Sequence, residues 1–198
     1  MVAAVLPDGT ADAKTTQEIA CDLLCMAPTP VPTNELLLQA GVRYRIEGGR
    51  WCPDRSVAGL HAAGAAAGTL PVDAQIQEGR LRGAEAAAAL GLLVPNLDLL
   101  QQEVAASPVQ SDASPCSGLC PALDQKQHKR FICLCEDVTE KDLQRAIAEG
   151  FDNIETLKRY STVNMGPCQG KMCGLLAAEV CAQSTGRDMN AVGMTTSR

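Results

Sequence analysis

The sequence has no excess of positive charge and no long apolar run, and each shortage excludes a class of protein. It carries 17 Lys and Arg against 23 Asp and Glu, a net charge of −6 at pH 7, which disfavours binding to nucleic acid. The longest apolar run covers residues 86–94. That is far short of the roughly 20 residues that a membrane-spanning helix needs. We therefore expect neither a nucleic acid nor a membrane as a partner.

Other absences narrow the chemistry and the compartment. The chain contains neither the GxGxxG dinucleotide fingerprint nor a P-loop. Its two histidines, His61 and His128, have no neighbouring residues that would make a nucleophilic triad, and we interpret His61 as packed in a strand. We find no catalytic residue. Its first residues lack the basic and apolar regions of a secretory signal peptide, so we expect a cytoplasmic protein.

Cysteine, in contrast, is plentiful, with ten residues. Four of them form two close pairs in the last third of the chain, Cys133-Leu-Cys135 and Cys168-Gln-Gly-Lys-Met-Cys173. Two thiolate pairs are how a protein brings four soft ligands to one metal centre. The pattern favours an iron–sulfur site. Structural zinc is an alternative that the one-residue spacer fits poorly, and inert thiols are another.

The surrounding sequence predicts how each pair is held. In an extended segment Cys133 and Cys135 point to the same side. The second pair lies where a loop enters a helix expected to begin near Gln169, so unpaired backbone N–H groups face its thiolates. Gly166 and Gly170 keep side chains away from the approach.

The six remaining cysteines are not predicted to bind a metal. In a reducing compartment a disulfide framework is not expected. Four of them read as buried small hydrophobes: Cys21, Cys25, Cys52 and Cys181. Cys116 and Cys120 have an allowed zinc spacing but no partner pair, and we interpret them as incidental.

Composition divides the chain into residues 1–94, a Pro-rich linker over 95–130 with one short helix at 97–105, and a helical domain over 131–198. In the first region the sequence predicts buried strands at 19–26 and from residue 57 into a small-residue turn ending at 68. It also predicts helices at 34–40 and 74–90 and a hairpin around residues 48–49. On the second helix Gly79, Gly83 and Ala87 fall four apart, which predicts a close neighbour against that face.

Helix signals are clearer after residue 131. Thr139 and Asp142 make a capping box, and Gly150 ends that helix. Asp152 with Glu155 opens a second helix. The helix expected near Gln169 is the third.

The stretches from Cys133 to Asp142 and from Met165 to Cys173 resemble the α subunits of heterotetrameric sarcosine oxidases and the related opine oxidase, hydroxyproline dehydrogenase and cyanide-forming glycine dehydrogenase subunits. The resemblance implies a small helical domain related to bacterioferritin-associated ferredoxin. Where this family keeps four cysteines, the domain binds a [2Fe–2S] cluster. The implied ligands are Cys133, Cys135, Cys168 and Cys173. The four-residue spacer of the second pair matches the opine and hydroxyproline branch.

Residues 19–26 and 57–68 are similar, less specifically, to the end of a two-dinucleotide-binding-domain flavoprotein. The resemblance implies cofactor contacts at Gly64 and Ala65, although many such proteins have an acidic residue where Ala65 stands. FAD or NAD would need the glycine-rich region that precedes this part in the family. The expected fold is α+β overall: a truncated, C-terminal part of a dinucleotide-binding, Rossmann-like α/β domain followed by a small all-helical [2Fe–2S] domain.

The resemblance implies an electron-transfer segment of a flavin-dependent amine or imino-acid oxidoreductase, whose partner is a flavin-dependent β subunit. The alternative is a cluster-free or zinc-stabilised interaction module that docks flavoprotein subunits.

Overall fold

The computed structural model describes residues 2–4, 6, 11–23, 31–47, 50–54, 57–106 and 129–197. They form helices and two separate two-stranded antiparallel sheets, the α+β class that the sequence predicts. The chain divides into two compact units. We call Met1–Pro30 with Ser117–Arg187 the cysteine unit, and Val31–Cys116 with Asp188–Arg198 the pocket unit.

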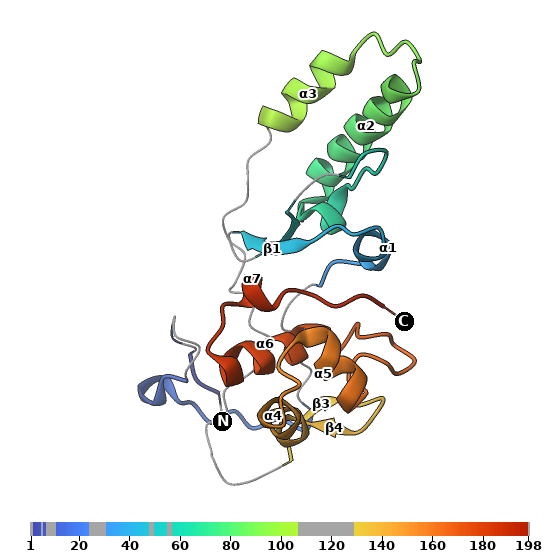
Figure 1. Ribbon diagram of the computed structural model, residues 1–198. Coiled ribbons are helices and arrows are strands. Elements are labelled where there is room, and N and C mark those ends of the chain that lie inside the picture. The colour runs from blue at the N-terminus through green and yellow to red at the C-terminus, as the bar shows by residue number, and fades with distance from the viewer. Residues whose placement is uncertain are drawn as a thin grey trace. The chain divides into compact units, whose positions relative to one another are not determined.

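The pocket unit combines one hairpin with two packed helices (Figure 1). Its elements are α1 (Glu35–Gln39), β1 (Tyr44–Glu47), β2 (Arg50–Pro53), the 3₁₀ helix η2 (Gly64–Ala67), α2 (Val72–Ala89), α3 (Leu97–Ala106) and α7 (Met189–Val192). The expected hairpin is confirmed, with Tyr44 opposite Pro53 and Glu47 opposite Arg50. Trp51 is buried within it.

Local contacts tie the hairpin to the rest of this unit. The Tyr44 hydroxyl donates to the Ala66 carbonyl at 2.5 Å, which joins β1 to η2. The Ile46 backbone N–H donates to Asn190 Oδ1 at 2.6 Å, which joins β1 to α7. Helix α3 packs along α2, so the helix expected near residues 97–105 belongs to this compact unit. The 95–130 linker boundary itself stays a prediction.

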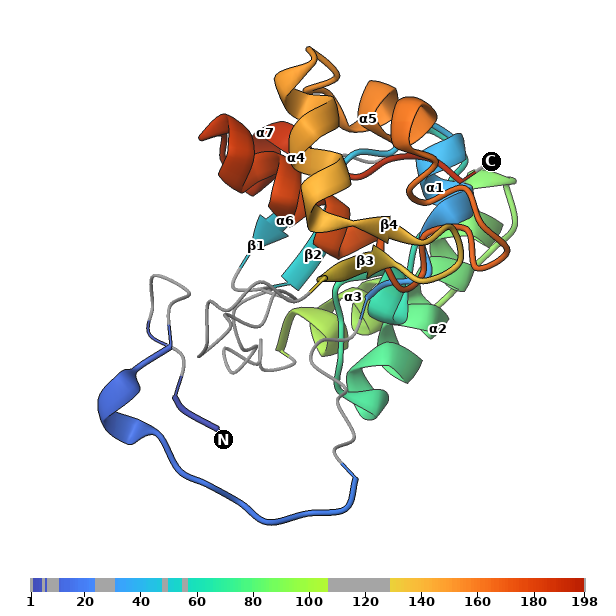
Figure 2. The ribbon, with the colours of Figure 1, turned by 90° about the horizontal axis from the view of Figure 1, so that it is seen from below.

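Among the described residues, the cysteine unit contains a small hairpin, a short 3₁₀ helix and three α-helices. Its elements are η1 (Ala13–Thr15), β3 (Phe131–Cys133), β4 (Val138–Thr139), α4 (Glu140–Ala148), α5 (Ile154–Ser161) and α6 (Gly174–Thr185). Figure 2 shows β3 and β4 side by side, with α4 starting where β4 ends. The helices enclose the fully buried side chains of Leu143, Leu157, Val163 and Val180.

Helix starts in this unit follow the capping rules. The capping box on α4 is confirmed, because Thr139 Oγ1 accepts from the Asp142 N–H and Asp142 accepts from the Thr139 N–H. Helix α5 begins one residue later than expected: Asn153 is its cap and accepts from the Glu155 N–H at 2.9 Å. The Asp152 carboxylate instead pairs with Arg187 at 3.1 Å.

Two strand predictions are wrong where the structure describes them. Residues 19–23 are not a strand, and Ile19 and Leu23 are 56% and 79% exposed; residues 24–26 of that prediction lie outside the described residues. Residues 57–63 have no regular structure, and η2 follows them. A buried strand needs partner strands on its edges, and no described segment of the chain provides them.

The expected close neighbour on α2 is also not found. A methyl group added at Gly79 or Gly83 would meet no described atom within 4 Å. Cys21 is exposed rather than buried, Cys52 is half-buried, and Cys181 is buried as expected. Three other residues of the sequence analysis, Cys25, Cys116 and Cys120, lie outside the described residues, as does His128.

Candidate metal centre

The four predicted ligands lie on two short segments of the cysteine unit. Cys133 is the last residue of β3, and Cys135 lies in the turn that leads to β4. Cys168 lies in the turns that precede α6, and Cys173 is the residue at the N-cap of α6. Helix α6 therefore begins at Gly174, later than the start near residue 169 that the sequence predicted.

The structure brings the four thiols together as two pairs. The thiols of Cys133 and Cys173 are hydrogen-bonded to one another, and both side chains are 1% exposed. The thiols of Cys135 and Cys168 are hydrogen-bonded as well, and this pair is more accessible: Cys135 is exposed and Cys168 half-buried. Each pair thus takes one thiol from each segment, and one pair is deep while the other faces outward.

Backbone donors surround Cys168. Positive φ angles at Gln169 (52°) and Gly170 (81°) turn successive N–H groups toward its sulfur. The Met172 N–H contributes most to lowering the pKa of the Cys168 thiol, and the Cys135 thiol and the N–H groups of Gly170 and Lys171 lower it further. Such a concave set of N–H groups favours an anion. The predicted backbone donors are therefore present, although they come from turns rather than from the first turn of the helix.

The remaining thiols have different surroundings. At Cys135 the Cys168 backbone N–H lowers the pKa, but the Cys168 thiol and burial outweigh it, so the pKa of Cys135 is raised. Burial, followed by the hydrogen bond with Cys133, raises the pKa of Cys173 to about 12. A thiol in this state is protonated at neutral pH, and a bound metal would have to displace that proton.

Gly166 makes room for the outward pair. A Cβ at this position would lie 2.4 Å from Cys135 Cβ and 3.0 Å from Glu136 Oε1. Real Cβ atoms do not approach so closely, so the contact between the two cysteine segments requires glycine here. The sequence prediction that Gly166 keeps side chains away from the site agrees with this contact.

Asn164 is a buried polar residue beside the inner pair that the sequence analysis missed. Its Oδ1 accepts from Cys173 Sγ at 3.0 Å, and its backbone N–H donates to the same sulfur. A signal was present in the sequence, because Asn tolerates the positive φ that this turn requires and stands four residues before Cys168.

The four thiols are paired rather than gathered around one point. No group of three or more His, Cys, Asp or Glu side chains in the described part of the chain is arranged around a single metal position. A mononuclear zinc site needs four ligands around one point. A two-iron cluster with four cysteines instead needs two thiolates on each iron, and paired thiols on opposed segments fit that requirement.

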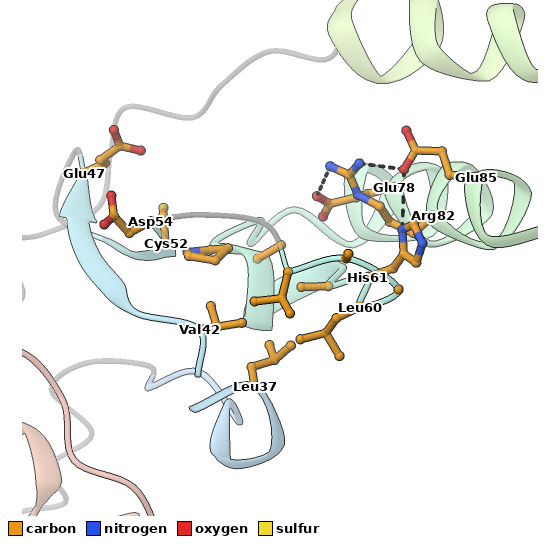
Figure 3. Close-up of a pocket in the computed structure, with 16 residues that line it drawn as sticks. Leu37, Val42, Glu47, Cys52, Asp54, Leu60, His61, Glu78, Arg82 and Glu85 are labelled. Atoms are coloured by element: carbon orange, nitrogen blue, oxygen red, sulfur yellow. Dashed lines mark hydrogen bonds and ion pairs between the residues drawn. The ribbon is translucent and has the colours of Figure 1, made fainter. Parts of the chain in front are cut away.

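The pocket unit holds a second candidate site, a pocket of about 630 Å³. Figure 3 shows Arg82 on its wall between Glu78 and Glu85, with His61 beside Glu85. Arg82 Nη1 lies 2.8 Å from Glu85 Oε2, and His61 Nδ1 lies 3.8 Å from the same oxygen. On the other side, Leu37, Val42 and Leu60 are apolar.

Sequence reasoning placed His61 in a strand, whereas it lies in an irregular segment at the rim of this pocket. The charged wall had a sequence signal that was overlooked. Glu78, Arg82 and Glu85 are spaced four and three residues apart, so they share one face of α2.

The structure places Gly64 and Ala65 at the start of η2, outside the residues that line this pocket. The Gly64 N–H donates to Glu78 Oε2 at 2.8 Å, and Ala65 is exposed. The first backbone N–H of η2 is therefore hydrogen-bonded to the Glu78 carboxylate of the same chain. The role of Gly64 and Ala65 in cofactor binding stays a prediction.

No described helix of this chain combines the length and the apolar character needed to cross a membrane.

Comparison with known proteins adds the family. Residues 127–198 match the sarcosine oxidase A3 domain. The chain is 31% identical over 185 residues to the sarcosine oxidase α subunit of Rhizobium meliloti. This alignment covers 92% of this chain and 18% of that protein. It is 30% identical over 182 residues to an opine oxidase subunit of the same organism, covering 85% of this chain and 39% of the relative.

A solved structure is also similar. The crystal structure of L-proline dehydrogenase from P. horikoshii superimposes with a TM-score of 0.65 at 26% identity, over 84% of this chain and 34% of that one. This chain thus spans less than half the length of each of these three proteins. The paired cysteine segments lie within the matched A3 domain, and the chain belongs to the sarcosine oxidase α-subunit family.

Proposed function

We propose that this chain is the electron-transfer segment of a flavin-dependent amine or imino-acid oxidoreductase, and that Cys133, Cys135, Cys168 and Cys173 hold a [2Fe–2S] cluster. The observation that carries the proposal is the meeting of the four thiols in two pairs across two segments, with backbone N–H groups directed at Cys168. When bound, such a cluster carries one electron at a time.

The site's uneven burial suggests a direction for electron exchange. The pair of Cys133 and Cys173 is enclosed by protein, and the pair of Cys135 and Cys168 reaches the surface. Electron transfer needs close approach of the partner, so the outward pair is the side at which we expect electrons to enter or leave. Exposure and hydrogen bonding at the sulfurs both set the potential of such a site.

The flavin belongs to the proposed complex rather than to this chain alone. The sarcosine and opine oxidase relatives are named as subunits, which supports a partner subunit here. Oxidation of an amine to an imine releases two electrons and two protons. We propose that both electrons pass to a flavin on a cytoplasmic β subunit, and that the segment described here passes them on singly. FAD or NAD near Gly64 and Ala65 would require a further dinucleotide-binding region.

Iron and sulfide analysis after anaerobic purification tests the proposal. We expect about two irons and two sulfides per chain, with the visible absorption of thiolate-bound iron. Cys168→Ser should lose most of both. Cys21→Ser is the matched control, because Cys21 is an exposed cysteine of the same unit and belongs to neither paired segment. A colourless protein containing zinc, in both the wild type and Cys21→Ser, would contradict the proposal and favour an interaction module.

A further inference from the structure

Asn164 is held in an unusual position next to the inner thiol pair. It adopts a positive φ of 68° and is only 3% exposed. Gly170 makes space for its side chain, and Gly174 lies at ordinary contact distance from it. A Cβ at Gly170 would lie 3.2 Å from Asn164 Oδ1, and one at Gly174 would lie 3.9 Å from the same atom. The amide is thus fitted between the turn at residue 170 and the first residue of α6.

The hydrogen bonding of this amide is incomplete. Oδ1 accepts from the Cys173 thiol at 3.0 Å, but Nδ2 is buried and has no hydrogen-bond partner among the described residues. A buried donor without an acceptor costs free energy, so each such group in a native structure calls for an explanation. The unused donor, Asn164 Nδ2, thus belongs to the same amide that contacts the proposed ligand Cys173.

Metal binding would reverse what Cys173 offers to this amide. A cysteine ligand is a thiolate, so it has no proton to donate and becomes an acceptor. Oδ1 would then lose its donor. Because the oxygen and nitrogen of an Asn amide are nearly the same size, a half-turn about the Cβ–Cγ bond exchanges their positions without disturbing the packing. That half-turn directs Nδ2 at the Cys173 sulfur and gives the orphaned donor a partner.

We propose that Asn164 is a positioning residue that donates its side-chain N–H to the Cys173 thiolate when the cluster is bound and so raises the cluster's reduction potential. The inference rests on the proposed function and concerns the same site. The backbone N–H of Asn164 already donates to this sulfur, so the side chain would add a second donor to the most buried ligand. Hydrogen bonds to cluster sulfurs stabilise the reduced, more negative state.

Two variants remove the donor without straining the turn. Asn164→Gly deletes the side chain and suits the positive φ, and Asn164→Asp keeps the shape but replaces the N–H donor with a carboxylate oxygen. Thr162→Gly is the matched control. Thr162 has a φ of 64° in the same turn and is exposed, and no hydrogen bond joins its side chain to the described cysteines.

The test measures iron and sulfide per chain and then the midpoint potential, by redox titration followed in the visible spectrum. We expect full cluster content in all three variants, a more negative potential in Asn164→Gly, a still more negative one in Asn164→Asp, and no shift in Thr162→Gly. Wild-type potential in a fully loaded Asn164→Gly overturns the inference alone. If Asn164→Gly alone fails to take up the cluster, a wild-type potential in the loaded Asn164→Asp overturns the inference instead. Absence of iron from the wild type overturns the proposed function and the inference together.

Discussion

Replacing Gly166 with alanine should disable the metal centre while leaving the rest of the cysteine unit folded. The added Cβ would lie 2.4 Å from Cys135 Cβ. Two carbon atoms are in favourable contact at about 3.5–4.0 Å, so the two segments have to separate by about 1 Å. The atom that is met is a Cβ fixed to the backbone, and it cannot rotate away. The displacement therefore falls directly on a proposed ligand.

The size of this shift decides the outcome. Ligand constellations have to be held within about 0.5 Å of their working geometry, so a displacement of about 1 Å exceeds the tolerance. Overpacking of this kind costs about 1–3 kcal/mol, which a domain with its own buried core can survive. The core side chains of Leu143 and Leu157 are fully buried on the helices and keep their packing. We expect a folded protein with little iron.

The assay is anaerobic reconstitution followed by iron analysis, with urea unfolding of the same samples. Gly174→Ala is the matched control, because its Cβ would meet its nearest neighbour, Asn164 Oδ1, at 3.9 Å, an ordinary contact. We expect Gly174→Ala to load like the wild type. If Gly166→Ala loads as much iron as Gly174→Ala, the close contact between the cysteine segments is not what the structure indicates, and the reasoning is refuted.

Three further changes test the packing and the helix caps, each by urea unfolding. Leu157→Ala should lower the free energy of unfolding of the cysteine unit by about 2–5 kcal/mol, because that side chain is 0% exposed and its removal leaves a cavity; a loss below this range would contradict the packing. Thr139→Ala should cost about 1 kcal/mol by removing the helix cap. The hydrogen bonds from Thr139 lower the pKa of Asp142, so their stabilisation is present above the usual Asp pKa and is lost as pH falls through the folded value. The difference between wild type and Thr139→Ala should therefore shrink in acid, and a constant difference would refute this explanation. Gly83→Ala should stabilise α2 by about 1 kcal/mol, since an added methyl meets no described atom within 4 Å; a loss of stability would reveal a neighbour on that face.

Local signals in the sequence predicted local structure well. The capping box of Thr139 and Asp142 needs only residues three apart, and it forms as expected. The hairpin at residues 44–53 and the long helix α2 were likewise predictable from alternation, from small turn residues and from the glycine at position 91. Such features depend on neighbours in the chain, which the sequence displays directly.

Features that depend on distant neighbours were predicted less well. The apolar run from Ile19 resembles a buried strand, but burial requires adjacent strands that no described residues supply, so Ile19 and Leu23 are exposed. The start of α6 was misplaced because the positive φ angles of Gln169 and Gly170 break the helical path before Gly174. That break is what directs the N–H groups at Cys168.

The candidate site shows the same division. Spacing alone selected the four cysteines, and the sequence placed one pair at a strand end and the other near a helix entry. It could not show that each contact joins one cysteine from each segment. Nor could it identify Asn164, whose role depends on its burial against Cys173 and on the space left by Gly170.

A reductive titration of the anaerobically purified chain tests the central claim most directly. A [2Fe–2S] cluster on the four cysteines should take up about one electron per chain, with loss of visible absorption in proportion. Zinc has no redox chemistry and inert thiols carry no such chromophore. Uptake of about one electron, abolished in Cys168→Ser and kept in Cys21→Ser, is the predicted result. A chain that accepts no electron in any of these forms would contradict the account.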